Sequence, residues 1–323
     1  MAGPVPVRSA SLVVNGAARR GAAAYDAVQR TLVDAGIELR HCALVDPSDL
    51  VGDVDTALGT GAGLLLVGGG DGTIGVVAGM LADLPAAARP VLGVLPLGTA
   101  NDFARTLGLP PDVASAVTAL VAGKVVDIDL GRANGIAFLN VASLGLSVAV
   151  TDALRPALKR RLGPAAYPLA AAMSYRRHVP FRARLEFPAG DVAPIDLGDL
   201  LQLAVGNGRH YGGGNTIAPD AGIDDATLDI YAIRAGRLRD HLRVARLLRN
   251  GTLVHSQHVH HLITRSVSLT TDEPLPVNLD GEIATTTPVE FVVQRNAIEV
   301  LVPAHVTHLR HDAALDHLIR PWQ

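Results

Sequence analysis

The sequence predicts a parallel α/β domain followed by an antiparallel β-sandwich domain. The first 125 residues alternate short, nearly all-apolar segments with helix-like segments, whereas the later residues carry many strand-like segments separated by turn signals. A chain of 323 residues is long enough to build two hydrophobic cores. The sequence contains no repeats and no low-complexity linker, so we expect the domains to pack together with a cleft between them.

Strands and helices are expected to alternate in the first region. Strands that are apolar on both faces are typical of a parallel sheet covered by helices on each side. The expected strands are 10–15, 37–45, 63–67 and 90–98. The expected helices are 22–36, 47–58, 73–84, 99–109 and 111–123.

Strands dominate the second region, which is typical of a sandwich. Paired strands are expected within 124–146, and a basic helical stretch at 150–178. Further strands are expected at 181–187, 200–208, 226–233, 260–271, 275–284 and 289–302. Helices are expected at 237–251 and 311–320.

Composition and charge narrow the class of protein. The formal net charge is -3, so no global positive field favours nucleic acid, and we expect no nucleic-acid partner. The single cysteine, Cys42, excludes a disulfide framework within one chain and fits a reducing compartment. The N-terminal residues lack the apolar region of a signal peptide, and no apolar run approaches the ~20 residues that span a bilayer. We expect a cytoplasmic protein that touches the inner face of the membrane at most peripherally.

The segment LLLVGGGDGTIGVVAGM, residues 64–80, places a glycine-rich loop after a strand. Its G-x-G-x-x-G spacing resembles a dinucleotide loop, but the next strand ends VLPLGT, without the acid that holds a ribose. Asp71 would repel a pyrophosphate, by about 1 kcal/mol at ~4 Å even in water. Mg²⁺ accepts carboxylate and phosphate oxygens together, so the aspartate favours a metal-bound phosphate. The alternative is a glycine-rich turn with Asp71 merely near a helix N-terminus.

A second polar loop, LPLGTANDFAR at 95–105, follows the next strand. Thr99 and Asp102 fit a capping box that starts a helix at Thr99, which would be a purely structural role. Adjacent parallel strands end at the same sheet edge, however, so both loops would line one crevice. Their amides, hydroxyl and carboxylates would suit a nucleoside triphosphate with magnesium.

Together, these two loops resemble the diacylglycerol kinase catalytic-domain family, which includes sphingosine and ceramide kinases and bacterial lipid kinases. The resemblance implies an α/β nucleotide-binding domain, a β-sandwich domain for the lipid substrate and a C-terminal return to the first domain. We therefore expect the first domain to comprise 1–129 plus 306–323 and the second 130–305. The resemblance continues at FLNVASLGLSVAV (138–150), YGGGNTIAPDAGIDDATLDIY (211–231) and NLDGEI (278–283).

The resemblance also implies roles for the loop residues. Asp71 and Asp102 would organise a catalytic Mg²⁺. The early loop NGAARRG departs from the family pattern, and the helical segment TIGVVAGM lacks the Asn-Glu pair that is frequent there. The residues expected to contact ATP are Asn15, Arg20, Gly69, Gly70, Asp71, Gly72, Thr73, Gly98, Thr99 and Asn101.

Asp280-Gly281-Glu282 has two interpretations. Asp-Gly between strand-like segments is a strong hairpin signal. The resemblance implies that these acids reach the phosphate cleft, with Glu282 as the base for the acceptor hydroxyl and Asp280 assisting or aligning it.

Two further clusters could bind metal. The resemblance implies a structural Mg²⁺ held by Asp225, but Ala226 stands where the family usually has glycine, and a solvated acidic loop is the alternative. His258 and His260 would share one strand face, and a solvated edge is the alternative to a metal site there.

The implied activity is ATP- and Mg²⁺-dependent phosphorylation of a membrane lipid alcohol, with diacylglycerol as the first candidate. The alternative substrates are sphingosine-like lipids, polyprenols and soluble molecules such as NAD. A second alternative is a non-catalytic nucleotide sensor. The protein could also form a homodimer. The basic and apolar residues of 154–178 suggest a membrane-docking face, with an ordinary amphipathic helix as the alternative.

Overall fold

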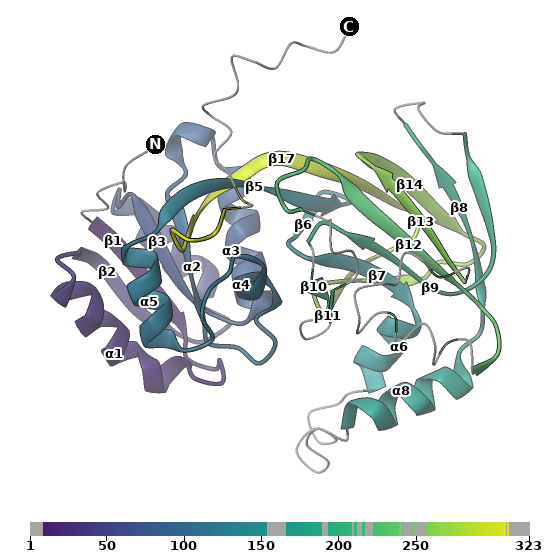
Figure 1. Ribbon diagram of the computed structural model, residues 1–323, viewed down its shortest axis with the longest axis horizontal. Coiled ribbons are helices and arrows are strands. Elements are labelled where there is room, and N and C mark those ends of the chain that lie inside the picture. The colour runs from purple at the N-terminus through teal and green to yellow at the C-terminus, as the bar shows by residue number, and fades with distance from the viewer. Residues whose placement is uncertain are drawn as a thin grey trace, which may run out of the picture.

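The computed structural model describes residues 9–153, 166–188, 193–208, 210–211, 215–216, 222–238, 241, 247, 256, 258–307 and 309. An α/β domain and a β-rich domain lie side by side, and two long strands pass from one to the other (Figure 1). This arrangement confirms the predicted fold class.

The α/β domain is built on a parallel sheet with the strand order β2-β1-β3-β4. All six residues of β3 are buried, which explains its uninterrupted apolar sequence. The strands are β1 (Ser9–Asn15), β2 (Glu38–Val45), β3 (Leu64–Gly69) and β4 (Val91–Pro96). The helices are α1 (Gly21–Asp34), α2 (Leu50–Gly59), α3 (Asp71–Asp83), α4 (Asp102–Thr106) and α5 (Val113–Val121), with a 3-10 turn at Ala86–Ala88.

In its described residues, the second domain consists of antiparallel strands with helices α6 and α8 on one side (Figure 1). Its core includes Phe138 and Phe291, whose rings meet edge to face at 6.3 Å. Strands β6 to β16 are Ile136–Phe138, Val141–Gly145, Phe181–Glu186, Ile195–Gly206, His210–Tyr211, Asn215–Thr216, Leu228–Arg234, Val259–Thr264, Ser266–Thr271, Pro276–Leu279 and Glu282–Thr286. The helices are α6 (Leu146–Ala153) and α8 (Ala166–Arg177).

Strands β5 (Lys124–Ala133) and β17 (Val289–Val302) join the two domains. They pair with each other in antiparallel register, and β17 also pairs parallel to β4 through Val300 and Leu92. Phe291 belongs to the sandwich core, whereas Val300 belongs to the α/β core. The expected division between residues 129 and 130 therefore falls inside β5, in a sheet that runs without interruption through both domains.

Several expected segments lie outside the described residues. They include residues 154–165 of the basic stretch, most of the helix expected at 237–251 and the whole of the helix expected at 311–320. No helix in the described part of the chain is long and apolar enough to cross a bilayer.

Candidate active site

The two glycine loops pack directly against each other at the carboxyl edge of the sheet. β3 and β4 are neighbours, and the N–H groups of Leu97 and Gly98 both donate to the carbonyl oxygen of Gly69. A Cβ atom on Gly98 would lie 2.4 Å from the Cα of Gly70, so no larger residue fits there. A Cβ on Gly69 would similarly lie 2.5 Å from the Cβ of Thr73. Gly98 is required because two backbones approach closely, and Gly69 is required because the side chain of Thr73 packs against it.

The first turn of α3 offers donors to an anion. No described side chain caps this helix, which follows Gly70 in extended conformation. The unsatisfied N–H groups of a helix N-terminus and its positive dipole end favour phosphate. Asn15, at the end of β1, donates from Nδ2 to Thr73 Oγ1 at 2.9 Å, and its Oδ1 accepts from the N–H of Ala17 at 2.9 Å. Asn15 therefore orients the threonine beside these donors.

Asp71 links the two loops. Its Oδ1 accepts a hydrogen bond from the N–H of Phe103 at 2.9 Å, so its carboxylate caps α4. Burial raises the pKa of the Asp71 carboxyl and the charge of Asp102 adds to this, while the bond from Phe103 opposes them. Asp102 is only 6% exposed. Two neighbouring, shielded carboxylates suit a divalent cation, which would offset their repulsion.

The prediction that a helix begins at Thr99 is wrong, because α4 begins at Asp102. Asn101 precedes it with a φ of 51°. The side chain of Asn101 turns back onto Gly98, accepting from its N–H at 2.9 Å and donating to its carbonyl at 3.2 Å. Residues 98–101 are therefore a tight loop, and Asp71 rather than Thr99 supplies the side-chain oxygen that caps the helix.

The Asp280-Gly281 hairpin turn is present, and it faces α3. Asp280 and Gly281 have φ values of 49° and 108°, as a two-residue turn between β15 and β16 requires. A Cβ atom on Gly72 would lie 3.2 Å from Glu282 Oε1, so this exposed carboxylate reaches the N-terminal turn of α3. The turn thus brings an acid from the sandwich domain to the glycine loop of the other domain.

Asp280 is held firmly by its surroundings. Its Oδ2 accepts from the N–H of Leu139 at 2.5 Å, and its Oδ1 accepts from Asn140 at 2.9 Å and Val141 at 3.0 Å. Burial raises the pKa of Asp280 to about 6, with the charge of Asp71 adding and the three hydrogen bonds opposing. Asp280 is therefore an anchor for the turn, and Glu282 is the acid left facing the loop.

Arg20 lies against the end of β4. Its Nη2 donates to the carbonyls of Pro96 and Pro111, each at 3.0 Å, and its N–H donates to Leu97. These contacts position the loop after β4. Contact with phosphate stays a prediction for this residue.

The Asp225 loop satisfies its carboxylate internally. Oδ1 accepts from the N–H and hydroxyl of Thr227, and Oδ2 accepts from the N–H of Gly222 at 2.9 Å. Ala226 adopts a φ of 58°, in the left-handed region that favours glycine over alanine. Glycine is the residue expected at this position from the resemblance described above. No group of three acidic, histidine or cysteine side chains among the described residues could hold a metal ion. A metal at Asp225 stays a prediction.

Of the two histidines considered for a metal site, His258 lies just before β13 and His260 lies within it. His260 and its neighbour His261 have protein partners. His260 Nε2 accepts from Arg234 Nε at 2.7 Å. His261 lies 2.6 Å from Asp229 Oδ1 and stacks on Tyr231. These contacts account for the side chains of His260 and His261 without a metal.

Asp129 is a buried acid that was not predicted from the sequence. It is 2% exposed in β5, and it accepts hydrogen bonds from the N–H of Asn296 at 2.8 Å and of Ala226 at 2.7 Å. Burial raises its pKa to about 6, and the charges of Asp225 and Asp224 add to this. An aspartate in the apolar strand VVDIDL was the available signal.

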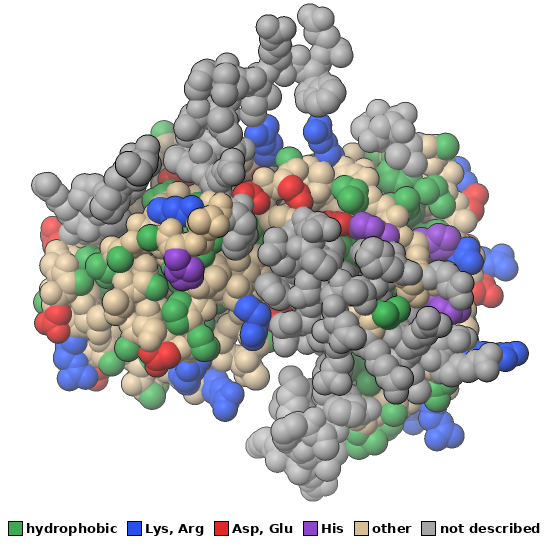
Figure 2. Space-filling model, viewed as in Figure 1, with side chains coloured by type: hydrophobic (Ala, Val, Ile, Leu, Met, Phe, Trp, Pro, Cys, Tyr) green, Lys and Arg blue, Asp and Glu red, His purple; other side chains and the backbone are tan. Residues whose placement is uncertain are grey.

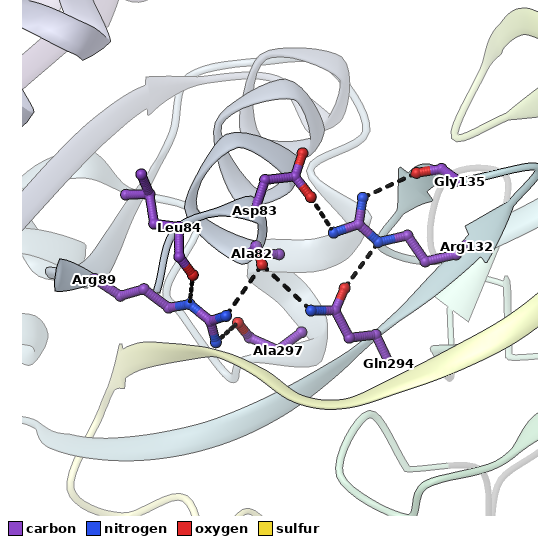
Figure 3. Close-up of polar contacts among 8 residues, drawn as sticks. All are labelled: Ala82, Asp83, Leu84, Arg89, Arg132, Gly135, Gln294 and Ala297. Atoms are coloured by element: carbon purple, nitrogen blue, oxygen red, sulfur yellow. Dashed lines mark hydrogen bonds and ion pairs between the residues drawn. The ribbon is translucent and has the colours of Figure 1, made fainter. Parts of the chain in front are cut away.

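The C-terminal end of α3 is fixed to the shared strands (Figure 3). Arg89 donates to the carbonyls of Leu84 and Ala82, and also to Ala297 of β17 at 2.7 Å. Arg132 of β5 pairs with Asp83 at 2.6 Å and donates to Gln294 at 2.8 Å. Both ends of α3 therefore touch elements that belong to or lead into the sandwich.

Comparison with known proteins identifies the family of this chain. Residues 9–133 match the diacylglycerol kinase catalytic domain, and residues 140–302 match the YegS C-terminal NAD kinase beta sandwich-like domain. The chain belongs to the diacylglycerol kinase catalytic-domain family. As a member, it is a lipid kinase, an ATP-dependent phosphotransferase.

Individual members of the diacylglycerol kinase family align over most of their length. A probable lipid kinase, YegS-like, from Chromohalobacter salexigens is 35% identical over 84% of this chain and 86% of its own. The diacylglycerol kinase of Bacillus subtilis is 33% identical over 74% of this chain and 78% of its own. The crystal structure of a diacylglycerol kinase from Bacillus anthracis superposes with a TM-score of 0.76 at 25% identity, covering 94% of this chain and all of that one.

Proposed function

We propose that the protein transfers the γ-phosphoryl group of ATP to the hydroxyl of diacylglycerol, giving phosphatidic acid, in the space between the α3 N-terminus and the Asp280-Gly281-Glu282 turn. The observation that carries this proposal is the position of Glu282 Oε1 against Gly72. It places one unanchored carboxylate beside a helix N-terminus that suits phosphate.

Each group at this site has a separate role in the proposed reaction. The first-turn N–H groups of α3 hold the phosphates, and Glu282 accepts the proton of the lipid hydroxyl as its oxygen bonds to the γ-phosphorus. The bond from that phosphorus to the bridging oxygen breaks, and ADP leaves. Asp71 and Asp102 would hold Mg²⁺, which would neutralise charge on the phosphates. Asp280 positions Glu282 through its three backbone bonds.

A lipid substrate requires contact with a bilayer. The formal net charge is -3, so attraction to a membrane has to be local. On the face viewed in Figure 2, acidic and basic side chains are interspersed. On α8, Leu169 and Met173 are 43% and 44% exposed at helical spacing, and Arg176 and Arg177 end the same helix. We propose this end of the sandwich domain as the docking face; Lys159, Arg160 and Arg161 of the expected face lie outside the described residues.

The test of function is turnover of Mg-ATP against diacylglycerol, sphingosine, undecaprenol and NAD. The proposal expects transfer to diacylglycerol above the other three. Preferential transfer to sphingosine or undecaprenol would support lipid kinase activity but contradict diacylglycerol as the substrate. Preferential transfer to NAD would contradict both the lipid kinase activity and the diacylglycerol substrate. Binding of ATP without turnover of any acceptor would favour a nucleotide sensor.

A matched pair of variants tests docking. Leu169→Glu with Met173→Glu is expected to weaken binding to vesicles containing anionic phosphatidylglycerol, while ATP binding stays unchanged. Val33→Glu, at an exposed valine on α1, is the control. Equal vesicle binding by the α8 variant and the control would contradict this docking face.

A further inference from the structure

A groove with a volume of about 330 Å³ runs along α3, between this helix and the β5–β6 and β15–β16 hairpins. Glu282 and Asp280 line one end of it, and Arg132 and Asp83 line the other. At that far end Arg132 forms an ion pair with Asp83 (Figure 3). Between these ends the lining is mainly apolar. The groove thus starts at the proposed catalytic base and leads away from it along the helix.

Three glycines of α3 line this groove, and an added Cβ atom would be crowded at two of them. A Cβ on Gly72 would lie 3.2 Å from Glu282, and one on Gly79 would lie 3.3 Å from the Cβ of Ala137. A Cβ on Gly75 would meet nothing closer than Asp280 Oδ2 at 3.8 Å, which is ordinary contact. Glycine weakens a helix interior relative to alanine, so a glycine with room for a methyl group indicates that the room itself has a use.

The groove is also lined by exposed apolar side chains. Val76 on α3 is 44% exposed and Ile136 on β6 is 43% exposed, on opposite walls. Met80 on α3 is partly buried farther along. Gly75 and Val76 lie in the helical segment that lacks the Asn-Glu pair frequent in the family, so these two positions bring neither an amide nor a charge to the groove. An apolar channel that begins at a base suits a ligand with a hydroxyl at one end and a hydrocarbon chain behind it.

We propose that this groove holds an acyl chain of the lipid acceptor, with the acceptor hydroxyl at Glu282 and the chain lying along Gly75, Val76 and Met80 toward the Arg132–Asp83 pair. This assignment rests on the proposed function, and it names Gly75 as the residue whose missing side chain makes space for the chain.

Gly75→Leu tests the proposal, because leucine would fill the groove from the helix side. Gly52→Leu is the matched control, since Gly52 lies within α2 with open space around it. The expected result is a KM for long-chain diacylglycerol, presented in detergent micelles, at least ten-fold higher in Gly75→Leu, with an unchanged KM for ATP. Dihexanoylglycerol, whose chains are short, should show a smaller increase. An unchanged KM for the long-chain lipid would overturn the proposal.

A binding measurement keeps the test independent of turnover. Titration with the fluorescent fatty acid cis-parinaric acid should show at least ten-fold weaker binding to Gly75→Leu and to Val76→Glu than to wild type. Gly52→Leu and Val51→Glu, which change exposed positions of α2, should bind as wild type does. Equal binding by all five proteins would overturn the groove assignment even if the enzyme phosphorylates lipid. Weaker binding only in the groove variants would support it even if diacylglycerol proved to be the wrong acceptor.

Discussion

The carboxylate of Asp71 accepts a hydrogen bond from the backbone N–H of Phe103, so the aspartate of one glycine loop caps the helix that follows the other. An acidic residue in a phosphate loop therefore has a structural role in addition to any role in binding metal. Because the bond needs only an oxygen atom, whereas metal binding needs charge, the two roles can be separated by substitution.

Asp71→Asn should preserve the structure and abolish most activity. The amide oxygen of asparagine can still accept from Phe103, so we expect the free energy of unfolding to change by less than about 1 kcal/mol. Loss of the charge that would hold Mg²⁺ should lower kcat by about 100-fold or more. Asp71→Ala should lose the cap as well, at an additional cost of about 1 kcal/mol. Wild-type kcat in Asp71→Asn would contradict the metal role.

The buried carboxyls of Asp129 and Asp280 predict a specific pH dependence of stability. Both pKa values are raised to about 6 in the folded protein, from about 4 when unfolded. Between these values the folded state binds more protons than the unfolded state does. The free energy of unfolding should therefore fall as the pH rises from about 4 to 6. Each group contributes up to roughly 3 kcal/mol to this fall.

Denaturation of Asp129→Asn across this pH range checks the argument. The variant cannot titrate at this position, so its stability should fall less steeply than that of wild type between pH 4 and 6. Its absolute stability at pH 4 is expected to be lower, because an asparagine can accept only one of the two hydrogen bonds from Asn296 and Ala226. An unchanged slope would show that Asp129 does not titrate as its burial requires.

Arg89 should be an important contributor to stability despite its distance from the loops. Its guanidinium satisfies two carbonyls at the end of α3 and one in β17, so Arg89→Ala leaves three acceptors without this partner. We expect a loss of about 2–3 kcal/mol in urea unfolding. Arg30→Ala, an exposed position on α1, is the control and should change stability by less than about 0.5 kcal/mol. Equal effects of the two variants would contradict the role of Arg89.

The order of the strands and helices in the α/β domain could be predicted because periodicity and glycine punctuation are local signals. The run LLLV predicts a buried strand, and Asp280-Gly281 predicts a hairpin turn; both are confirmed. The use of β5 and β17 by both domains could not be predicted, because pairing between Val126 and Val300 depends on contacts far apart in the sequence. The start of α4 was misplaced for the same reason, since its cap comes from Asp71, 31 positions before the helix starts.

The candidate site was partly accessible from sequence. The glycines and acids of the loops were identified by residue type, and the structure brings Gly72 and Glu282 together. What the sequence could not supply was the difference between the two acids of the turn. Only the geometry shows that Asp280 is anchored by three N–H groups while Glu282 faces the helix. The buried Asp129 was likewise hidden within a strand.

The most direct measurement of the central claim is Mg²⁺-dependent transfer of labelled phosphate from ATP to diacylglycerol by wild type and by Glu282→Gln, with Glu290→Gln, an exposed glutamate on β17, as the control. Loss of the base at the α3 N-terminus should lower kcat by about 100- to 10,000-fold, leaving ATP affinity and thermal stability unchanged. Phosphate transfer by Glu282→Gln at the rate of the wild type and of the control would contradict the assignment of Glu282 as the catalytic base.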